Sequence, residues 1–401
     1  MPRILFTTQV FYPSHDAISQ ILEELSVGLA KMGCEVHVLT PAANYMTREE
    51  LVRHELHEGV RIWRLPALRS DKGNLFRRSL SYGAFLGLSG PALALIPLPD
   101  VAFYLSMPPA LGWSASPLRR LSGARTVFVA EDVYPEILER SGKVTSGSLL
   151  GALGRFERSV LRGMDRVVVL GERMREVMEG KGVSREKIAV IENWSIGGGV
   201  GDAAREGNPL LSRLGLADRF VVEYSGNMGV VHDMAPIADA ARRLKGDPRV
   251  AFLLIGDGKR RAEMEASKSA ERLDNMTLLP YQPREELSTS LAAADVALIS
   301  LRPEMEGLVV PSKLYGILAS GRPVLNIGDP DGEVARIIDR AGCGVTVRSG
   351  EELARAISRL ADDGGARAAM GERARVYSEA HCGRGRALQK YRDLIEELTG
   401  R

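Results

Sequence analysis

The chain has 401 residues, of which 45% are hydrophobic and 26% charged. These proportions are typical of a soluble globular protein, and they exclude a disordered, collagen-like or coiled-coil chain. At roughly 150 residues per domain, the length predicts two large domains. The formal net charge of +2 provides no overall field that would attract nucleic acid. Three scattered cysteines do not suit a disulfide framework, and the first residues lack the features of a signal peptide, so we expect a cytoplasmic protein.

Short apolar runs alternate with helical patterns in the first half of the chain. This alternation predicts βα units around a parallel sheet. Apolar side chains at helical spacing predict a helix over residues 18–32, which Gly33 would end. Strands are predicted at residues 3–7, 35–40, 59–64, 101–105, 126–129, 166–170 and 188–191.

Residues 61–130 contain nine Arg or Lys residues against Asp71 and Asp100, a net charge of +7, and residues 79–99 within them carry no charge at all. This uncharged run has three interpretations. It is long enough for a transmembrane helix, although Pro91 in its middle disfavours one. It also suits a helix packed in the core, or a surface that rests on an anionic membrane.

The segment after Asn193, SIGGGVGDAAREGNPLLSRLGL, is rich in glycine and polar residues. It predicts a linker over residues 197–218, between a first domain at 1–196 and a second domain at 219–383. The second domain repeats the alternation, with helices at 234–244 and 260–272 and strands at 220–225, 250–255, 276–279, 296–300, 323–327 and 344–347. A final helix is predicted at 384–398.

Ligands of open parallel sheets bind beyond the carboxyl ends of the strands, so candidate residues lie in the loops that follow strands. The first loop lacks the glycine patterns of dinucleotide and P-loop sites, and its His15 either contacts substrate or is solvated. After the strand at 126–129, Glu131 and Asp132 either have a catalytic or acceptor-binding role or cap a helix. His54 and His57 lack a third ligand and indicate solvated surface, not a metal site.

The second domain has two glycine-containing turns. Gly226, Asn227 and Gly229 follow its first strand, where free backbone N–H groups would suit an anion, although tight turns also require glycine. Gly256, Gly258 and Lys259 follow the next strand, where the basic residues either cover phosphates or decorate a helix surface.

The segment 301–316 is the densest in candidate residues. Glu306 precedes a helix whose first turn offers Ser312 and Lys313. Amides and Lys313 would bind a diphosphate, and Glu306 would bind sugar hydroxyls. The alternative is a capped core helix with a solvated lysine.

In their order and spacing, these motifs resemble a family 4 glycosyltransferase of the GT-B fold over nearly the whole chain. The matching pieces are FYPSHDAISQ, DVYPE, YSGNMG, LLIGDG, LPYQPREEL, AADVALISLRP and PSKLYGILASGRPV. The subgroup it most resembles builds bacterial surface polysaccharides, often by adding an amino sugar to a lipid-linked acceptor.

The resemblance implies two Rossmann-like domains facing an interdomain cleft, with the acceptor on the first and the donor on the second, and a last helix, 384–401, packed back on the first. It implies retaining transfer of a sugar, such as an N-acetylhexosamine, from a UDP-sugar to a hydroxyl of a glycan or lipid-linked acceptor, without a metal or cofactor. By family position, Gly226, Asn227 and Gly229 would lie near the diphosphate, Tyr281 and Gln282 near the base, Glu131 and Asp132 near the transferred sugar, and Glu306 would hold the donor sugar.

Three positions depart from the family. The family's two glutamates, which have seven residues between them, fall on Leu308 and Gly316, so the ribose contact is missing. Leu308 and Val309 stand where donor-binding residues are expected. His15-Asp16 replaces Gly-Gly in the opening loop, and Val230 replaces a basic residue, which leaves Lys313 as the leading diphosphate cation. A nucleotide-sugar epimerase and a catalytically weak nucleotide-sugar-binding subunit therefore remain as alternatives.

Overall fold

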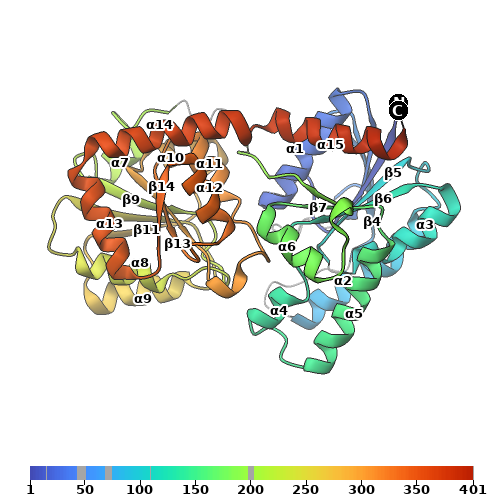
Figure 1. Cartoon of the computed structure of the whole chain (residues 1–401), viewed down its shortest axis with the longest axis horizontal. Helices are drawn as coiled ribbons and strands as arrows, with labels where there is room; N and C mark the ends of the chain where they lie inside the picture. Colours follow the sequence, from blue (N-terminus) through green and yellow to red (C-terminus); the bar gives the residue numbers. More distant parts are fainter. Residues whose placement is uncertain (15, 43–50, 68–74, 109, 197–202, 401) are drawn as a thin grey trace. The chain divides into compact units, whose positions relative to one another are not determined.

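The computed structural model describes residues 1–14, 16–42, 51–67, 75–108, 110–196 and 203–400 (Figure 1). The chain divides into two units, each an α/β domain around a mainly parallel sheet, as predicted. Unit 1 consists of Met1–Ile196, Gly307–Val309 and Arg384–Arg401, and unit 2 of Gly197–Glu306 and Val310–Gly383. The acceptor and donor roles of the units, and the cleft, stay predictions.

Unit 1 is built on an eight-stranded sheet with the order β3-β4-β2-β1-β5-β6-β7-β8, in which only β3 runs antiparallel to its neighbour. The central strands are fully buried, which explains their continuous apolar sequences. The strands are β1 (Arg3–Thr7), β2 (Glu35–Pro41), β3 (His54–His57), β4 (Val60–Leu65), β5 (Val101–Leu105), β6 (Arg125–Ala130), β7 (Arg166–Val169) and β8 (Ile188–Val190).

The helices of unit 1 come from both ends of the chain. They are α1 (Ala17–Lys31), α2 (Leu75–Ala92), α3 (Ala115–Ser122), α4 (Glu136–Arg140), α5 (Gly147–Gly163), α6 (Glu172–Gly180) and α15 (Arg384–Thr399), with short 3-10 turns η1 (Leu111–Ser114) and η2 (Arg185–Lys187). The predicted final helix is thus α15.

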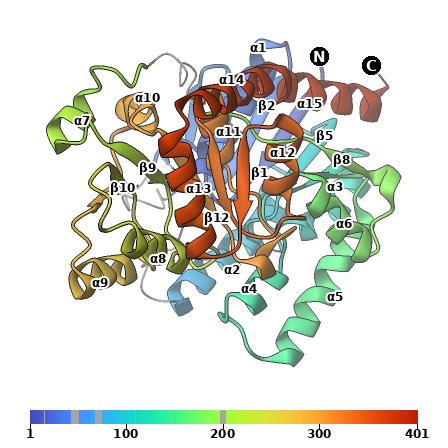
Figure 2. The ribbon, with the colours of Figure 1, turned by 60° about the vertical axis from the view of Figure 1, so that its left-hand side comes forward.

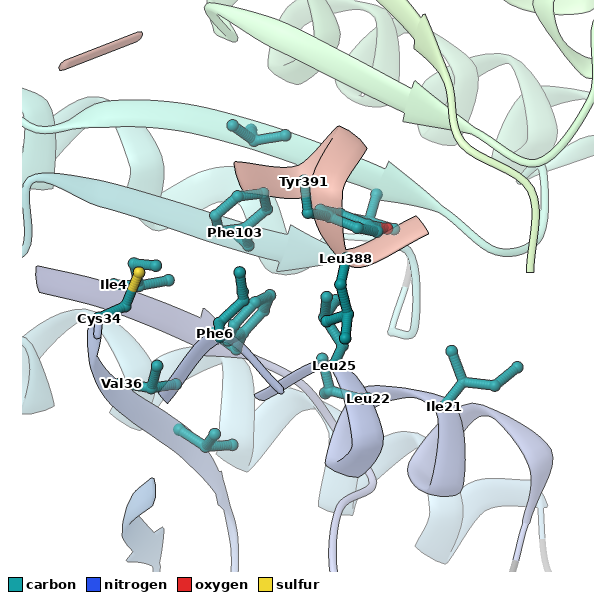
Figure 3. Close-up of a cluster of buried hydrophobic side chains, with 14 of the residues drawn as sticks. Ile4, Phe6, Ile21, Leu22, Leu25, Cys34, Val36, Phe103, Leu388 and Tyr391 are labelled. Atoms are coloured by element: carbon teal, nitrogen blue, oxygen red, sulfur yellow. The ribbon is translucent and has the colours of Figure 1, made fainter. Parts of the chain in front are cut away.

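Helix α15 packs against α1 and the sheet of unit 1. Figure 3 shows Leu388 and Tyr391 of α15 beside Leu25, Phe6 and Phe103. The Phe6 and Phe103 rings are stacked with centroids 4.8 Å apart, and Tyr391 meets Phe103 at 6.0 Å. The side chain of Leu388 also fills the space left by Gly28, where a Cβ would lie 2.6 Å from its Cδ2. These contacts make α15 an integral part of the core of unit 1.

The polar stretch around His54 forms the edge strand β3. His57 stacks on Tyr12 with ring centroids 3.8 Å apart, and its Nε2 lies 2.9 Å from Glu23. His54 meets the edge of the Trp63 ring. The strand was not predicted, and these contacts show two histidines with structural roles. Among the residues that the structure describes, no cluster of three His, Cys, Asp or Glu side chains suits a metal ion.

The uncharged run 79–99 forms most of α2 and the turn that follows it. Phe85, Ala92, Leu93 and Ile96 are buried, as expected for a core helix, but several leucines of the same run are exposed. In the described parts of the chain, no helix has the length and hydropathy that crossing a bilayer requires.

Unit 2 has a six-stranded parallel sheet with the order β11-β10-β9-β12-β13-β14, the order of a Rossmann domain. In Figure 2, β9 and β10 lie between α10 on one side and α8 with α9 on the other. Its strands are β9 (Phe220–Ser225), β10 (Val250–Ile255), β11 (Met276–Leu279), β12 (Val296–Ser300), β13 (Val324–Ile327) and β14 (Gly344–Val347). Its helices are α7 (Pro209–Leu214), α8 (Ala235–Arg243), α9 (Arg261–Glu271), α10 (Leu287–Ala292), α11 (Lys313–Ala319), α12 (Glu333–Ala341), α13 (Gly350–Asp362) and α14 (Gly364–His381), with 3-10 turns η3 (Arg284–Glu286) and η4 (Pro303–Met305).

The segment predicted as a linker, 197–218, contains helix α7. Asn208 caps this helix by accepting hydrogen bonds from the backbone N–H groups of Leu210 and Leu211. Both leucines are buried in a cluster with Val221 and Leu253 of the sheet. The linker prediction was therefore wrong over this helix, which is packed on the core of unit 2.

Candidate functional site

The acidic loop of unit 1, residues 131–136, begins where β6 ends. The side-chain oxygen of Ser106, which follows the neighbouring strand β5, accepts hydrogen bonds from the backbone N–H groups of Glu131 and Asp132, both at 3.1 Å. Asn193, which follows β8, donates from its Nδ2 to Glu131 at 3.4 Å. Three loops at the carboxyl ends of the strands therefore converge on Glu131.

The carboxyl groups of Glu131 and Asp132 in this loop are electrostatically perturbed. Burial raises the pKa of Glu131 to about 7, against a lowering by the Asn193 hydrogen bond, and the charge of Asp132 raises it further. Burial also raises the pKa of Asp132 to about 6, opposed by the nearby charge of Lys143. Groups that titrate near neutral pH in a loop of this kind are candidates for catalysis.

Residues from the second half of the chain complete this loop. Gly307–Val309 belong to unit 1, where Val133 donates its N–H to the Leu308 carbonyl at 2.9 Å and Val309 forms a single bridge with Asp132. Leu308 is buried. Leu308 and Val309 therefore lie beside the acidic loop and outside unit 2, to which the sequence assigned them as donor-binding residues.

A buried ion cluster anchors the far end of the acidic loop. The Nζ of Lys181 donates to the Tyr134 carbonyl at 2.9 Å and to Glu136 at 2.7 Å, and it forms an ion pair with Glu157 of α5. Burial raises the pKa of Glu157 to about 7, although Lys181 counteracts this. The loop is thus held by Ser106 at one end and by Lys181 at the other.

In unit 2, the two glycine-containing turns lie against each other. Met228 donates its N–H to the Asp257 carbonyl at 2.8 Å, and Arg260 donates its N–H to the Met228 carbonyl at 2.9 Å. Gly256 and Gly258 have φ of +138° and +142°, and a Cβ on Gly258 would lie 2.5 Å from the Met228 oxygen. Loop packing alone therefore requires both glycines, whether or not they also bind a ligand.

Lys313 reaches from the start of α11 to the tip of the first glycine turn. Its Nζ is buried and has no hydrogen-bond partner among the described residues. It lies 3.5 Å from the centroid of the buried Tyr224 ring and close to Gly226, where φ is +131° and a Cβ would lie 3.2 Å from Nζ. Burial lowers the pKa of Lys313 to about 7. A solvated lysine is therefore excluded.

His232 is a second buried basic group near Lys313. Its Nδ1 lies 2.5 Å from the Ser300 carbonyl, which can only accept, so Nδ1 carries the proton. Burial and the charge of Lys313 lower the pKa of His232 to about 3. Of these two basic groups, Lys313, with a pKa of about 7, is therefore the one that can carry a positive charge near neutral pH, whereas His232 is neutral there.

The candidates in and near the second glycine turn are more exposed. Lys259 is exposed, whereas Arg261 donates from its guanidinium to the Leu279 carbonyl at 2.7 Å and has a structural role. Tyr281 is 53% exposed and near Asp257, whose charge adds to burial in raising the tyrosine pKa. Gln282 donates to the Pro280 carbonyl at 2.8 Å. The exposed ring of Tyr281 could stack on a base.

The remaining predicted residues of unit 2 differ in their contacts. Glu306 accepts a hydrogen bond from the backbone N–H of Glu333 at 3.2 Å, so its carboxylate lies at the positive end of α12. Ser312 precedes α11 without a side-chain capping bond. Asn227 is exposed, and its carbonyl accepts from Tyr224 at 2.8 Å. Gly229 lies in the same turn, which does not lead directly into a helix, because α8 begins only at Ala235.

His15 lies outside the described residues. Sequence reasoning missed Ser106, Asn193 and Lys181 as supports of the acidic loop. Ser106 and Asn193 each follow a predicted strand, so the rule that ligands bind beyond strand ends could have found them. Lys181 had no such signal, because its partners lie on other helices.

Two family models match the chain. Residues 17–194 match the glycosyl transferase 4-like domain, and residues 216–377 match the glycosyl transferases group 1 domain. The chain is 31% identical over 301 residues to the probable glycosyltransferase WbjE of Pseudomonas aeruginosa, which covers 74% of each chain. It is 28% identical over 324 residues to the putative colanic acid biosynthesis glycosyl transferase WcaI of Escherichia coli K12, covering 78% of this chain and 79% of WcaI.

Solved structures share the fold at lower identity. Sucrose-phosphate synthase from Thermosynechococcus elongatus has a TM-score of 0.78 at 18% identity and covers 100% of both chains. HepE from Anabaena, solved in complex with UDP, has a TM-score of 0.72 at 14% identity and covers 98% of this chain and 100% of its own. With these matches over both units, the chain belongs to the family 4 glycosyltransferases of the GT-B fold and is a hexosyl-transferring enzyme.

Proposed function

We propose that this enzyme is a retaining, metal-independent transferase that moves an N-acetylhexosamine or a related amino sugar from a UDP-sugar to a hydroxyl of a glycan or lipid-linked acceptor. The donor would bind at the glycine turns of unit 2 and the acceptor on unit 1. A lipid-linked acceptor would bring the enzyme to the inner face of the plasma membrane as a peripheral protein.

Lys313 is the observation that carries this proposal. Its Nζ is buried without a hydrogen-bond partner in the described part of the chain, and a buried ammonium is costly unless an anion pairs with it. The turn beside it, with Gly226 at its tip, has the small residues that let a phosphate approach the backbone. A diphosphate would supply the missing counter-charge. That HepE, a protein of the same fold, was solved with UDP supports a uridine nucleotide.

In the proposed reaction, the bond between the sugar C1 and the diphosphate oxygen breaks while the acceptor oxygen bonds to C1 on the same face. The proton of the acceptor hydroxyl passes to the departing phosphate, so no protein base is needed. Lys313 would stabilise the negative charge that develops on this phosphate. Glu131 and Asp132 would bind hydroxyls of the transferred sugar.

The test is a thermal-shift panel of UDP, GDP, ADP and UDP-N-acetylglucosamine with magnesium or with EDTA, since a ligand of the folded state stabilises it. We expect stabilisation by UDP and the UDP-sugar in both buffers. Release of UDP with acceptor, and an NMR spectrum showing that the product keeps the anomeric configuration of the donor, would follow. Stabilisation only with magnesium, or only by GDP or ADP, would contradict the proposal.

Gly316 favours one alternative, a nucleotide-sugar-binding subunit with weak activity, because the glutamate expected at this position would contact the ribose. In that case UDP stabilises the protein, but no UDP is released with any acceptor fraction. An assay of UDP release against glycan and lipid extracts distinguishes the two functions.

A further inference from the structure

Helix α2 of unit 1 has an inverted distribution of polar and apolar side chains. Ser81 and Ser89 are buried, whereas Leu80 and Leu88 are 53% and 42% exposed. A surface helix normally buries its apolar stripe and exposes charges. Burial of Phe85 on the opposite side shows that α2 is correctly seated on the core, so its apolar outer face is a property of the folded protein.

The exposed positions of α2 form one continuous stripe. Leu80, Gly83, Gly87, Leu88 and Pro91 are exposed and follow each other at intervals that place them on one side of a helix. None of them is charged or can form a side-chain hydrogen bond. In the turn after the helix, Leu95 and Leu98 are 77% and 50% exposed. From residue 80 to 98, this side of the protein therefore offers water only apolar atoms and backbone.

The apolar surface continues onto η1 and α3. The Trp113 Nε1 donates to the Leu86 carbonyl at 2.9 Å, and its exposed ring covers Gly90 of α2. Leu121 on the following helix is also exposed. We define the apolar–basic face by the exposed side chains of Leu80, Leu88, Leu95, Leu98, Trp113 and Leu121 together with the neighbouring arginines Arg119, Arg120 and Arg125.

The charged side chains of α3 are both cationic. Arg119 and Arg120 are exposed in the last turn of α3, and Arg125 follows at the start of β6. The acidic residues nearby are already engaged. Asp165 pairs with Arg119 and Arg125, and Asp100 accepts from the backbone N–H of Arg3 at 2.7 Å. Arg120 forms no ion pair with any residue that the structure describes.

We infer that the apolar–basic face binds the surface of an anionic lipid bilayer. Leucine and tryptophan side chains would enter the boundary between headgroups and acyl chains, and the arginines would contact lipid phosphates. A second copy of the chain fits less well, because a symmetric contact through this face would bring the arginines of both copies together. The inference rests on the proposed function, in which a lipid-linked acceptor places the reaction at a membrane.

The test is co-sedimentation of the full chain with vesicles of phosphatidylcholine, alone or mixed with phosphatidylglycerol. We expect binding to the mixed vesicles that weakens with salt, and little binding to the neutral ones. Replacing two of the exposed leucines, Leu88→Glu with Leu95→Glu, should reduce binding at least about tenfold. Arg120→Glu changes two charges, each worth about fivefold, and should reduce binding about 25-fold.

Val376→Glu and Arg355→Glu are the matched controls, because both side chains are exposed on helices of unit 2 and should leave vesicle binding unchanged. An unchanged thermal shift with UDP shows that each variant is folded. No binding of the wild type to mixed vesicles, or equal binding of the face variants, overturns the inference even where UDP still stabilises the protein. Self-association that the same variants abolish, without vesicle binding, also overturns it. Vesicle binding without any UDP shift supports the face and removes the proposed donor.

Discussion

Replacing Lys313 with methionine is expected to stabilise the empty protein and to weaken nucleotide binding at least about tenfold. Burial lowers the pKa of Lys313 from 10.5 to about 7. At 1.36 kcal/mol per pKa unit, the charged form costs about 5 kcal/mol more in the folded than in the unfolded chain. Because the unfolded chain binds this proton more tightly, the lysine destabilises the fold below about pH 10. At pH 7.5 the destabilisation is about 4 kcal/mol, an upper limit that relaxation of the site reduces.

Lys313→Met removes this cost and keeps the length of the side chain. We expect the empty variant to unfold at least about 2 °C higher than the wild type, since a unit of this size gains about 2–4 °C per kcal/mol. The difference should shrink as the pH rises toward 10, where the destabilisation has fallen to about 1 kcal/mol, and it disappears only above the unfolded pKa of 10.5. Thermal unfolding between pH 7 and 10 measures this trend.

The same variant should lose the effect of UDP. At a UDP concentration of about 100 times Kd, the wild type gains about 2.7 kcal/mol. Hydrogen bonds to a charged group contribute about 1.5–3 kcal/mol, so without them the gain falls below about 1.3 kcal/mol at the same concentration. Lys245→Met, an exposed lysine of unit 2, is the control and should change neither quantity. A variant that unfolds earlier but keeps the full UDP shift would refute the assignment of Lys313 to an anion site.

Three further changes test other parts of the site. Glu131→Gln should lower kcat/KM. It should also stabilise the protein increasingly as the pH rises from 5 to 8, because the raised pKa of about 7 means that ionising Glu131 destabilises the fold in that range. Urea unfolding at several pH values measures this, and a difference in unfolding free energy between variant and wild type that stays constant with pH would contradict it. Lys181→Met leaves the buried Glu157 and the half-buried Glu136 without their cation and should cost about 3–5 kcal/mol in urea unfolding. The double variant Lys181→Met with Glu157→Gln should recover part of this loss, and no recovery would show that the Glu157 carboxylate is not its source. Gly316→Glu should tighten UDP binding in calorimetry, because it restores the glutamate that would contact the ribose. The new side chain fits, since a Cβ at Gly316 meets only Leu291, at 3.5 Å, and weaker binding would mean that the donor lies elsewhere.

The strands were predictable because burial on both faces leaves a continuous apolar run in the sequence. The run 101–105, for example, is β5 at the same residues. Strand β3 was missed because it lies at the edge of the sheet, where His54 and His57 contact side chains of other segments and need no apolar pattern. Helix α7 was missed because it is only six residues long, and the leucines that pack it on the core, Leu210, Leu211 and Leu214, are too short a signal within a glycine-rich segment.

The site was predictable to the level of loops. The rule that ligands bind beyond strand ends selected the acidic loop, both glycine turns and the start of α11. It could not show that Leu308 joins unit 1, because that contact depends on the path of the chain in space. Nor could it show that Lys313 lies over Tyr224 and that its Nζ has no hydrogen-bond partner among the residues the structure describes. Such an absence is visible only when all neighbours of the side chain are known.

The place of α15 in the chain has a consequence for biosynthesis. Unit 1 takes five of its buried core residues from α15: Ala387, Leu388, Tyr391, Leu394 and Ile395. All of unit 2 is translated between the first 196 residues and this helix. The ribosome therefore releases a complete unit 2 before the apolar side of unit 1 can be covered, although unit 1 is started first. During that interval nascent unit 1 leaves Phe6, Leu25 and Phe103 without their cover from α15, so unit 1 is the aggregation-prone part of the growing chain.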